Sequence, residues 1–309
     1  MPAEVYGNAY RFLEPAEMLT FDEIVRLARL FVRLGVSKVK LTGGEPLLRP
    51  WLPDLVSRLA SVEGIDDLAL ITNGARLSRM ARLLREAGLR RLTVSLDSLD
   101  ERTFEAMNGR AHRLKPVLEG IAAAEAQGFS AVKLNAVVIR GMNDHQVLDL
   151  VRRFRGTGHI VRFIEYMDVG NRNGWRRELV VPSRETLEAI HREHPLEPLE
   201  PNYRGEVASR YRFLDGSGEI GFISSVTQPF CRDCTRLRLS AEGRLYTCLF
   251  AGVGFDLRGP LRRGATDDDL ASLVRGLWSR RTDRYSEERA ASSTGRGGQQ
   301  KVEMYAIGG

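Results

Sequence analysis

The stretch FDEIVRLARLFVRLGVSKVKLTGGEP, residues 21–46, indicates the fold class. Over residues 21–35 its apolar side chains recur at the spacing of one helix face, and Gly35 ends the pattern. The next residues, VSKVKLT (36–42), alternate as a strand does, and two glycines follow at once. A helix, a strand and a glycine turn in this order form a repeating unit of α/β proteins.

The same unit recurs along the chain. We predict further helices over 52–61, 77–87, 114–127, 143–155 and 182–193, and further strands over 68–72, 91–97, 132–138 and 160–167. Repeated β-α units predict a parallel sheet with right-handed crossovers, either open or closed into a barrel. The alternation then stops. Two short strands, SRYRFLD and EIGFISS, a cysteine-rich hairpin, a linker SSTGRGGQQ (292–300) and KVEMYAIGG follow.

Composition narrows the class of protein. The 309 residues are 43% hydrophobic, enough for a core, and no apolar run approaches the ~18 residues typical of a membrane span. The first residues lack the basic and then apolar layout of a signal peptide. Three cysteines, an odd number, predict a reducing compartment, hence the cytoplasm. The net charge of +6 fits a basic protein or an anionic partner, and the placement of the charge must decide.

Polar side chains share one face of several predicted strands. These are Lys38, Lys40 and Thr42; Thr93, Ser95 and Asp97; Lys133 and Asn135; and, on the strand over 160–167, Arg162. If the other faces pack under helices, the cations point into a barrel or cleft, where an anion such as a nucleoside triphosphate would neutralise them. The alternative is that the lysines lie on edge strands and reach water. TGGEP, TNG, SLD and MD directly follow strands, where β-α folds carry ligand sites.

All three cysteines lie in CRDCTRLRLSAEGRLYTC, residues 231–248, at the spacing C-x2-C-x13-C. A three-residue turn, 241–243, predicts a hairpin that pairs Ser240 with Arg244, Arg238 with Tyr246 and Arg236 with Cys248. That register brings the thiols together and places both arginines on their face. Three interpretations remain: a structural zinc site that lacks a fourth ligand, unrelated buried thiols, or an iron–sulfur cluster with one open iron that binds substrate.

Together these motifs resemble the radical SAM GTP 3′,8-cyclases of molybdenum cofactor biosynthesis. The similar stretches, which span most of the chain, are KVKLTGGEPLLRP, LITNG, LTVSLDSLDERTFEAMNG, VKLNAVVIRGMND, RFIEYMDVGN, CRDCTRLRLSAEGRLYTCLF and the final Gly-Gly. The resemblance implies an α/β fold: an incomplete (β/α)6 radical SAM-type barrel over 1–200, followed by a C-terminal extension over 201–309 that binds an iron–sulfur cluster and GTP.

The resemblance also implies roles for single residues. An auxiliary [4Fe–4S] cluster would be bound by Cys231, Cys234 and Cys248. GTP would be contacted by Lys40, Lys133, Arg162, Arg236 and Arg238, and S-adenosylmethionine by Gly44, Ser95 and Met167. Gly308 and Gly309 match the family's diglycine tail, which with Arg236 and Arg238 would complete the catalytic site.

The implied reaction is conversion of GTP to 3′,8-cyclo-7,8-dihydro-GTP. A 5′-deoxyadenosyl radical takes the ribose 3′ hydrogen, and the carbon radical then attacks C8 of guanine. The implied partners are an electron donor and a downstream cyclic pyranopterin monophosphate synthase. A homodimer is a further possible assembly, and neither nucleic acid nor membrane is expected.

The chain departs from the family pattern at two places. Ile71 stands where many members have a threonine hydroxyl that contacts GTP. The family's N-terminal C-x3-C-x2-C motif, which binds the SAM-cleaving cluster, does not occur, and the chain opens with MPAE, which follows that motif in the family. We therefore expect the printed chain to bind GTP and the auxiliary cluster without cyclase activity.

Two alternatives to a cyclase remain. The first is a non-catalytic, GTP-binding iron–sulfur or zinc protein. The second is a peptide-modifying radical SAM enzyme, but those enzymes carry more auxiliary cysteines and lack the R-x-R after the C-x2-C.

Overall fold

The computed structural model describes residues 13–109, 113–291 and 301–308. The α-helices are α2 (Phe21–Arg33), α3 (Leu52–Ala60), α4 (Leu77–Glu86), α5 (Glu101–Asn108), α6 (Leu114–Ala126), α7 (Val147–Phe154), α8 (Ser183–Glu193), α9 (Arg258–Arg262), α10 (Asp267–Ser279), α11 (Tyr285–Ala291) and α12 (Met304–Ile307). The strands are β1 (Lys38–Leu41), β2 (Asp67–Thr72), β3 (Arg91–Ser95), β4 (Lys133–Val138), β5 (Ile160–Glu165), β6 (Leu196–Leu199), β7 (Ser209–Phe213), β8 (Glu219–Ile223), β9 (Arg238–Leu239), β10 (Arg244–Tyr246) and β11 (Phe255–Asp256).

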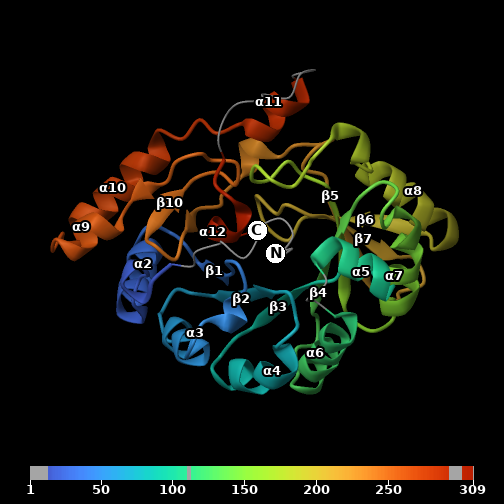
Figure 1. The fold of residues 1–309 in the computed structure, drawn as a ribbon, viewed down its shortest axis with the longest axis horizontal. Helices are drawn as coiled ribbons and strands as arrows, with labels where there is room; N and C mark the ends of the chain where they lie inside the picture. Colours follow the sequence, from blue (N-terminus) through green and yellow to red (C-terminus); the bar gives the residue numbers. More distant parts are fainter. Residues whose placement is uncertain (1–12, 110–112, 292–300, 309) are drawn as a thin grey trace.

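The large sheet has eight strands in the order β1-β2-β3-β4-β5-β8-β7-β6. Strands β1 to β5 and β8 run parallel, and β7 and β6 continue the sheet antiparallel. The sheet curves, and α3, α4 and α6 lie along its outer side (Figure 1). Among the described residues no strand pairing joins β1 to β6, so the barrel stays open there. The predicted α/β fold with a parallel sheet is confirmed.

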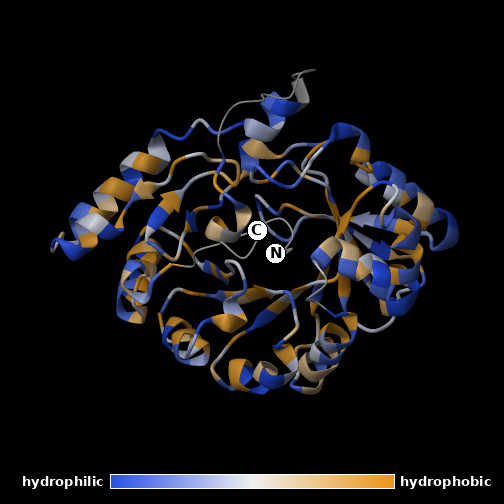
Figure 2. Ribbon diagram, in the orientation of Figure 1, coloured by the Kyte–Doolittle hydropathy of each residue, from blue (hydrophilic) through white to orange (hydrophobic). Residues whose placement is uncertain are grey.

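The strands are held under the helices by aliphatic side chains. Leu70, Val94 and Leu134, on three neighbouring strands, are fully buried and belong to the main core with α3, α4 and α6. These side chains point outward from the sheet and pack against the helices. Figure 2 shows that hydrophobic residues occur both along the strands and on the helices beside them. The alternate residues of the same strands therefore face the interior of the barrel.

The cysteine hairpin has the predicted register. Arg238 pairs with Tyr246 and Leu239 with Leu245, while the Ser240 amide donates to the Arg244 carbonyl at 2.9 Å. Gly243 closes the turn at φ +80°, a conformation that favours glycine. Strand β11 completes a second sheet, and α12 lies within the curve of the large sheet near its centre (Figure 1).

Several elements differ from the sequence prediction. Helix α5 was not predicted, and the helix expected over 143–155 starts as a 3-10 turn, Asp144–Gln146, before α7. The expected strands SRYRFLD and EIGFISS are β7 and β8. The sheet also runs across the proposed boundary at residue 200, because β6 to β8 extend the same sheet as β1 to β5. The division at residue 200 stays a prediction, and the predicted linker 292–300 lies outside the described residues.

No helix in the described ranges has the length and apolar character needed to cross a membrane.

Candidate active site

Cations from three strands line the interior of the barrel. Lys40 comes from β1, Lys133 from β4 and Arg162 from β5, on the interior parity predicted from the sequence. Arg162 is only 8% exposed, and its Nε donates to Asn135 Oδ1 at 2.9 Å across the β4–β5 pair. This hydrogen bond fixes the direction of the guanidinium.

These cations affect one another's protonation. Burial, and then the charges of Arg162, Arg91, Lys133 and Arg236, lower the pKa of Lys40 to about 8. Lys40 still keeps more than a third of its surface open, because it projects into the barrel interior rather than into packed core. Burial and Arg162 likewise lower the pKa of Lys133 to about 8. An anion placed among these groups would relieve both the repulsion and the cost of burial.

Arg91 belongs to the same cluster, although sequence analysis did not single it out. It begins β3 and forms an ion pair with Asp67 of the neighbouring strand. Strand alternation could have predicted its position, since Arg91 lies on the same interior face of the strand as Thr93 and Ser95. A second unpredicted contact places Lys38 over the Tyr203 ring, 3.1 Å from the ring centroid. The loop that connects β6 to β7 therefore reaches back to β1.

The cysteine hairpin brings further cations to this cluster. Arg236 Nε donates to Cys234 Sγ at 3.3 Å, and Arg236 is close enough to Lys40 to lower its pKa. Burial and Arg236 lower the pKa of Arg238 to about 10. Leu237 and Leu239 point the other way and pack on a second hydrophobic core, which includes Leu245 of β10. The arginines thus face the barrel cations while the leucines anchor the hairpin.

The three cysteines are half-buried free thiols. Burial opposes ionisation of Cys234, but Arg236 and Arg281 outweigh it and lower the pKa of Cys234 to about 7. Burial raises the pKa of Cys248, and Asp283 and Cys231 add to that rise. Cys231 lies near enough to Cys248 to raise its pKa, and Arg236 donates to Cys234, so the thiols stand in a cationic setting that suits thiolate ligands of a metal cluster.

Among the described residues no three His, Cys, Asp or Glu side chains are placed to hold one metal ion. The chemistry of the donor set therefore has to decide between a single ion and a cluster, and three thiols are one ligand short of a structural zinc site. Zinc draws all its thiolates to about 2.3 Å from one centre. A [4Fe–4S] cluster binds each thiolate through a different iron, so its ligand sulfurs lie farther apart. The donor set, three thiols flanked by arginines, fits a cluster.

The carboxyl ends of β1 and β2 are joined by one carboxylate. Glu45 accepts hydrogen bonds from Thr72 Oγ1 and the Asn73 amide, both at 2.7 Å, and from the Leu47 amide at 3.0 Å. This bridge holds the Gly43–Gly44 turn in place, and a Cβ at Gly44 would meet nothing within 4 Å. Gly44 thus leaves open space above the sheet, where a ligand can approach the backbone.

The sequence analysis also singled out Ser95, Met167 and Ile71, which lie on or after three different strands. Ser95 is half-buried on the interior parity of β3, in register with Asn135. Met167 is the second residue after β5, and its carbonyl accepts from Asn173 Nδ2 at 2.7 Å. Ile71 is half-buried on β2 beside Thr93, so this position offers no hydroxyl to the interior.

The C-terminal segment enters the same region. Gly308 is buried, and its carbonyl accepts from Arg238 Nε at 3.4 Å. A Cβ on Gly308 would lie 2.1 Å from Cγ2 of Thr42, at the end of β1, and the residue has φ +71°. Only glycine fits this position without displacement. Gly309 lies outside the described residues.

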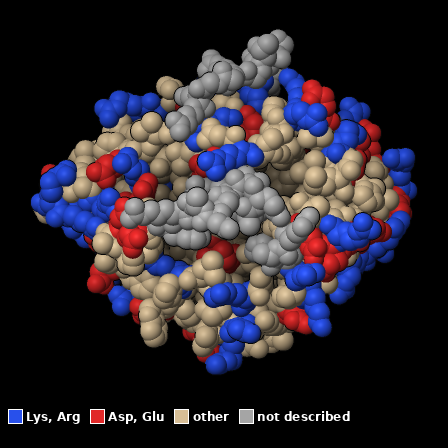
Figure 3. Space-filling view, in the orientation of Figure 1, with Lys and Arg blue, Asp and Glu red and all other residues tan. Residues whose placement is uncertain are grey.

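Basic and acidic side chains are intermixed around the rim of the face shown in Figure 3. In the interior, Lys40, Lys133 and Arg162 gather around Arg91, whose ion-pair partner is Asp67. Charge placement therefore favours an anionic ligand in the barrel over a basic outer surface as the site of binding.

A curved parallel sheet with its polar residues at the strand ends and interior defines the class of protein. The family model "Radical SAM superfamily" matches residues 5–154, and "Molybdenum Cofactor Synthesis C" matches residues 159–287. A solved structure of Streptococcus suis SuiB bound to S-adenosylmethionine has a similar fold, with a TM-score of 0.56. It is 14% identical and the match covers 78% of this chain and 55% of that one.

Full-length relatives narrow the class to one family. A GTP 3′,8-cyclase of Xanthomonas campestris pv. campestris (strain B100) is 54% identical over 309 residues, which cover all of this chain and 89% of the relative. The GTP 3′,8-cyclases of Acidothermus cellulolyticus and Staphylococcus saprophyticus are 52% and 45% identical, each aligned over all of this chain and 91% of the relative. The chain belongs to the GTP 3′,8-cyclase family of radical SAM enzymes.

Proposed function

We propose that this chain binds GTP in the barrel interior and serves its conversion to 3′,8-cyclo-7,8-dihydro-GTP in molybdenum cofactor biosynthesis. The observation that carries the proposal is the convergence of cations from two parts of the fold. Lys40, Lys133 and Arg162 come from the barrel strands, and Arg236 and Arg238 from the hairpin. Together they match the several negative charges of a triphosphate.

The chain's own residues would divide the work. The lysines and Arg162 hold the phosphates, while Arg236 and Arg238 orient the rest of the nucleotide beside the cysteines. Cys231, Cys234 and Cys248 would hold an auxiliary [4Fe–4S] cluster. When bound, that cluster would supply an open iron, a Lewis acid to which the guanine base can donate an electron pair.

S-adenosylmethionine, the cofactor of the superfamily, would lie over the strand ends. Gly44 offers room for it, and Ser95 and Met167 stand on neighbouring parts of the same edge. Gly308, which lies against Thr42 and accepts a hydrogen bond from Arg238, would close the site where the C-terminal segment enters it. A closed interior excludes water from a radical intermediate.

The test measures binding rather than turnover. All three cysteines of the sequence lie in the hairpin, so none is left to bind the SAM-cleaving cluster that turnover would need. The chain is reconstituted anaerobically with iron and sulfide, and its iron content and affinity for GTP are determined. We expect about four irons per chain. K133M and R238M should each weaken GTP binding about tenfold or more, because each removes a charge-assisted contact. K115M, which removes an exposed lysine of α6, is the matched control.

Two results would contradict the proposal. One zinc per chain with no iron would favour a structural zinc site. Equal GTP affinities of K133M, R238M and K115M would remove the barrel interior as the nucleotide site.

A further inference from the structure

The loop after β5 forms hydrogen bonds with the C-terminal segment, mainly from the Asn171 side chain to the Lys301 backbone. Asn171 Oδ1 accepts from the Lys301 amide at 3.0 Å, and Asn171 Nδ2 donates to the Lys301 carbonyl. The backbone N–H of Asn171 donates to Glu303 Oε1 at 3.0 Å. Gly170 has φ +65°, a conformation that favours glycine, and a Cβ there would lie 2.2 Å from Glu303 Oε2. The bonded residues of the two segments are 130 or more positions apart in sequence, yet they fit side by side.

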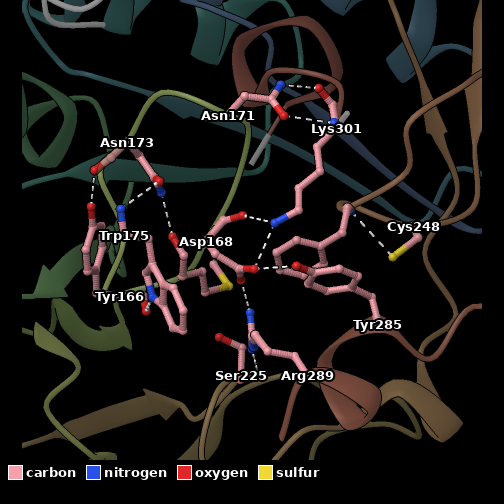
Figure 4. A network of polar contacts seen from close by, with 12 residues as sticks. Tyr166, Asp168, Asn171, Asn173, Trp175, Ser225, Cys248, Tyr285, Arg289 and Lys301 are labelled. Atoms are coloured by element: carbon pink, nitrogen blue, oxygen red, sulfur yellow. Dashed lines mark hydrogen bonds and ion pairs between the residues drawn. The ribbon is translucent and has the colours of Figure 1, made fainter. Parts of the chain in front are cut away.

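Asp168 stands at the centre of this contact (Figure 4). Lys301 Nζ donates to its carboxylate at 2.8 Å and to its carbonyl at 2.7 Å. The Tyr285 hydroxyl and the Arg289 guanidinium donate to the same carboxylate. The side chains of Asp168, Lys301 and Arg289 are only 13%, 10% and 5% exposed. One buried carboxylate therefore serves two buried cations.

The two cations are not held equally. Arg289 also donates to the Ser225 carbonyl at 2.7 Å and lies over the rings of Trp175, Phe250 and Tyr285. The ammonium group of Lys301 has Asp168 as its hydrogen-bond partner and sits 4.6 Å from the Tyr285 ring centroid. Lys301 can thus leave while Arg289 still neutralises Asp168.

This contact also joins two parts of the site. Asp168 follows Met167 directly. On the other side, Tyr285 stacks on Phe250 with ring centroids 4.4 Å apart, and the Phe250 amide donates to Cys248 Sγ at 3.5 Å. The C-terminal segment continues from Lys301 through α12 to Gly308, which contacts Arg238 and Thr42.

We propose that Asp168 is a positioning residue that holds the C-terminal segment through Lys301 and so keeps Gly308 in the site. The contact itself does not depend on the proposed function; only the purpose of a positioned Gly308 rests on it. The energetic reason is that Lys301 would be costly to bury without the carboxylate of Asp168. Loss of the pair should therefore release the segment rather than unfold the barrel.

The test follows hydrogen–deuterium exchange of residues 302–308 in the full chain. The amides of Val302 and Gly308 are bonded in the docked segment, at 2.9 Å to the Ala251 carbonyl and 2.8 Å to the Met304 carbonyl. We expect D168N and K301M each to speed exchange there about tenfold or more. Because both remove one interaction, D168N/K301M should exchange no faster than the faster single variant.

The controls separate positioning from general loss of structure. K301R keeps a cation that can reach Asp168 and should restore exchange to within about threefold of wild type. E219Q breaks a half-buried ion pair with Arg210 away from the segment and should leave exchange of 302–308 unchanged. If D168N also speeds exchange in β4 and β5, the exchange rates of residues 302–308 in K301M and K301R are compared instead, because these variants leave Asp168 in place.

Wild-type exchange rates in K301M, or equal rates in K301M and K301R, would overturn the proposal. GTP affinity is measured on the same samples and should change less than about threefold in K301M, because Lys301 lies outside the cation cluster. Absence of GTP binding in the wild type would count against the proposed function alone, since the exchange result does not require a nucleotide.

Discussion

At the scale of single residues, the alternation of side chains along strands predicted most of the residues that line the candidate site. Lys40, Lys133 and Arg162 could be placed in the interior because side chains alternate along a strand and one face must pack under helices. The same rule would have included Arg91. What parity could not show is the contact of Lys38 with Tyr203, because that loop returns from a distant part of the chain.

The two barrel lysines predict a pH dependence of GTP binding. Both have pKa values of about 8, lowered by burial and by neighbouring cations from an ordinary value of 10.5. A lysine with a lowered folded pKa costs stability while it is charged; the cost is present below pH 8 and disappears as pH rises toward 10.5. A bound triphosphate instead favours the charged forms. GTP affinity should therefore hold steady up to about pH 7 and fall between pH 7 and 9.

Calorimetric titration of GTP across this pH range checks the prediction, with proton uptake read from buffers of different ionisation enthalpy. K40M and K133M should each show a shallower fall. An affinity that stays constant to pH 9.5, or an equally steep fall in both variants, would contradict it.

Replacement of Glu45 should lower the free energy of unfolding more than the exposure of this residue alone would suggest. Its carboxylate joins two loops through three hydrogen bonds, from Leu47, Thr72 and Asn73. Glutamine keeps one acceptor oxygen and points an NH2 group at a donor, so at least one buried donor loses its partner. We expect E45Q to lower the free energy of unfolding by about 1–3 kcal/mol.

Urea unfolding of E45Q beside E63Q, a change at an exposed loop residue, measures this effect. The two variants should differ by more than about 1 kcal/mol. Equal stabilities would mean that the loops do not depend on this carboxylate.

Local signals decided which elements were predictable. The helices from α2 to α8 that carry long amphipathic patterns were placed correctly, and the hairpin register followed from a three-residue turn. Helix α5, with eight residues, is too short for its periodicity to stand out. The position of β8 beside β5 depends on tertiary pairing, since the neighbouring strands β7 and β6 are antiparallel. The contact of Asp168 with Lys301 was equally out of reach, because no local pattern relates residues so far apart.

Helix α2 illustrates how an element end can connect two regions. Its capping box pairs Thr20 and Glu23, and Glu23 also forms an ion pair with Arg262 of α9 at 2.8 Å. The hydrogen bond from Arg262 outweighs burial and lowers the pKa of Glu23 to about 2. A lowered carboxyl pKa stabilises the fold above the unfolded value of 4.5, and this contribution is lost as pH falls toward 2.

We expect E23Q to cost about 1–2 kcal/mol at pH 7, after allowance for the solvent around Arg262. The difference from wild type should shrink as the pH is lowered from 4.5 to 3. Chemical unfolding at pH 7, 4.5 and 3 measures it, and E86Q, at an exposed helix pair with Arg82, is the matched control. A difference that does not depend on pH would assign the effect to the cap rather than to the ion pair.

At the scale of the whole molecule, α2 belongs to two cores. Val25 and Ala28 pack into the main core under the large sheet, while Leu27 and Leu30 pack into a second core with the hairpin, α9 and α10. Figure 1 shows α2 between the large sheet and β10. The barrel and the cysteine hairpin are therefore attached to opposite faces of one helix, which fixes the hairpin arginines relative to the barrel lysines.

This arrangement predicts that the two cores unfold together. Leu27 is completely buried, and L27A should lower the free energy of unfolding by about 2–5 kcal/mol through lost burial and a cavity. Because α2 also carries Val25 and Ala28, loosening its second face should weaken the main core in the same transition. L273A, at a residue of α10 that is 37% exposed, should change stability by less than about 1 kcal/mol. Unfolding followed by far-UV circular dichroism and by tryptophan fluorescence should give coincident curves in wild type and in L27A. If L27A instead shows a first transition confined to the C-terminal region while the barrel keeps wild-type stability, the division near residue 200 marks two independent folding units, and the hairpin arginines owe their placement to something other than α2.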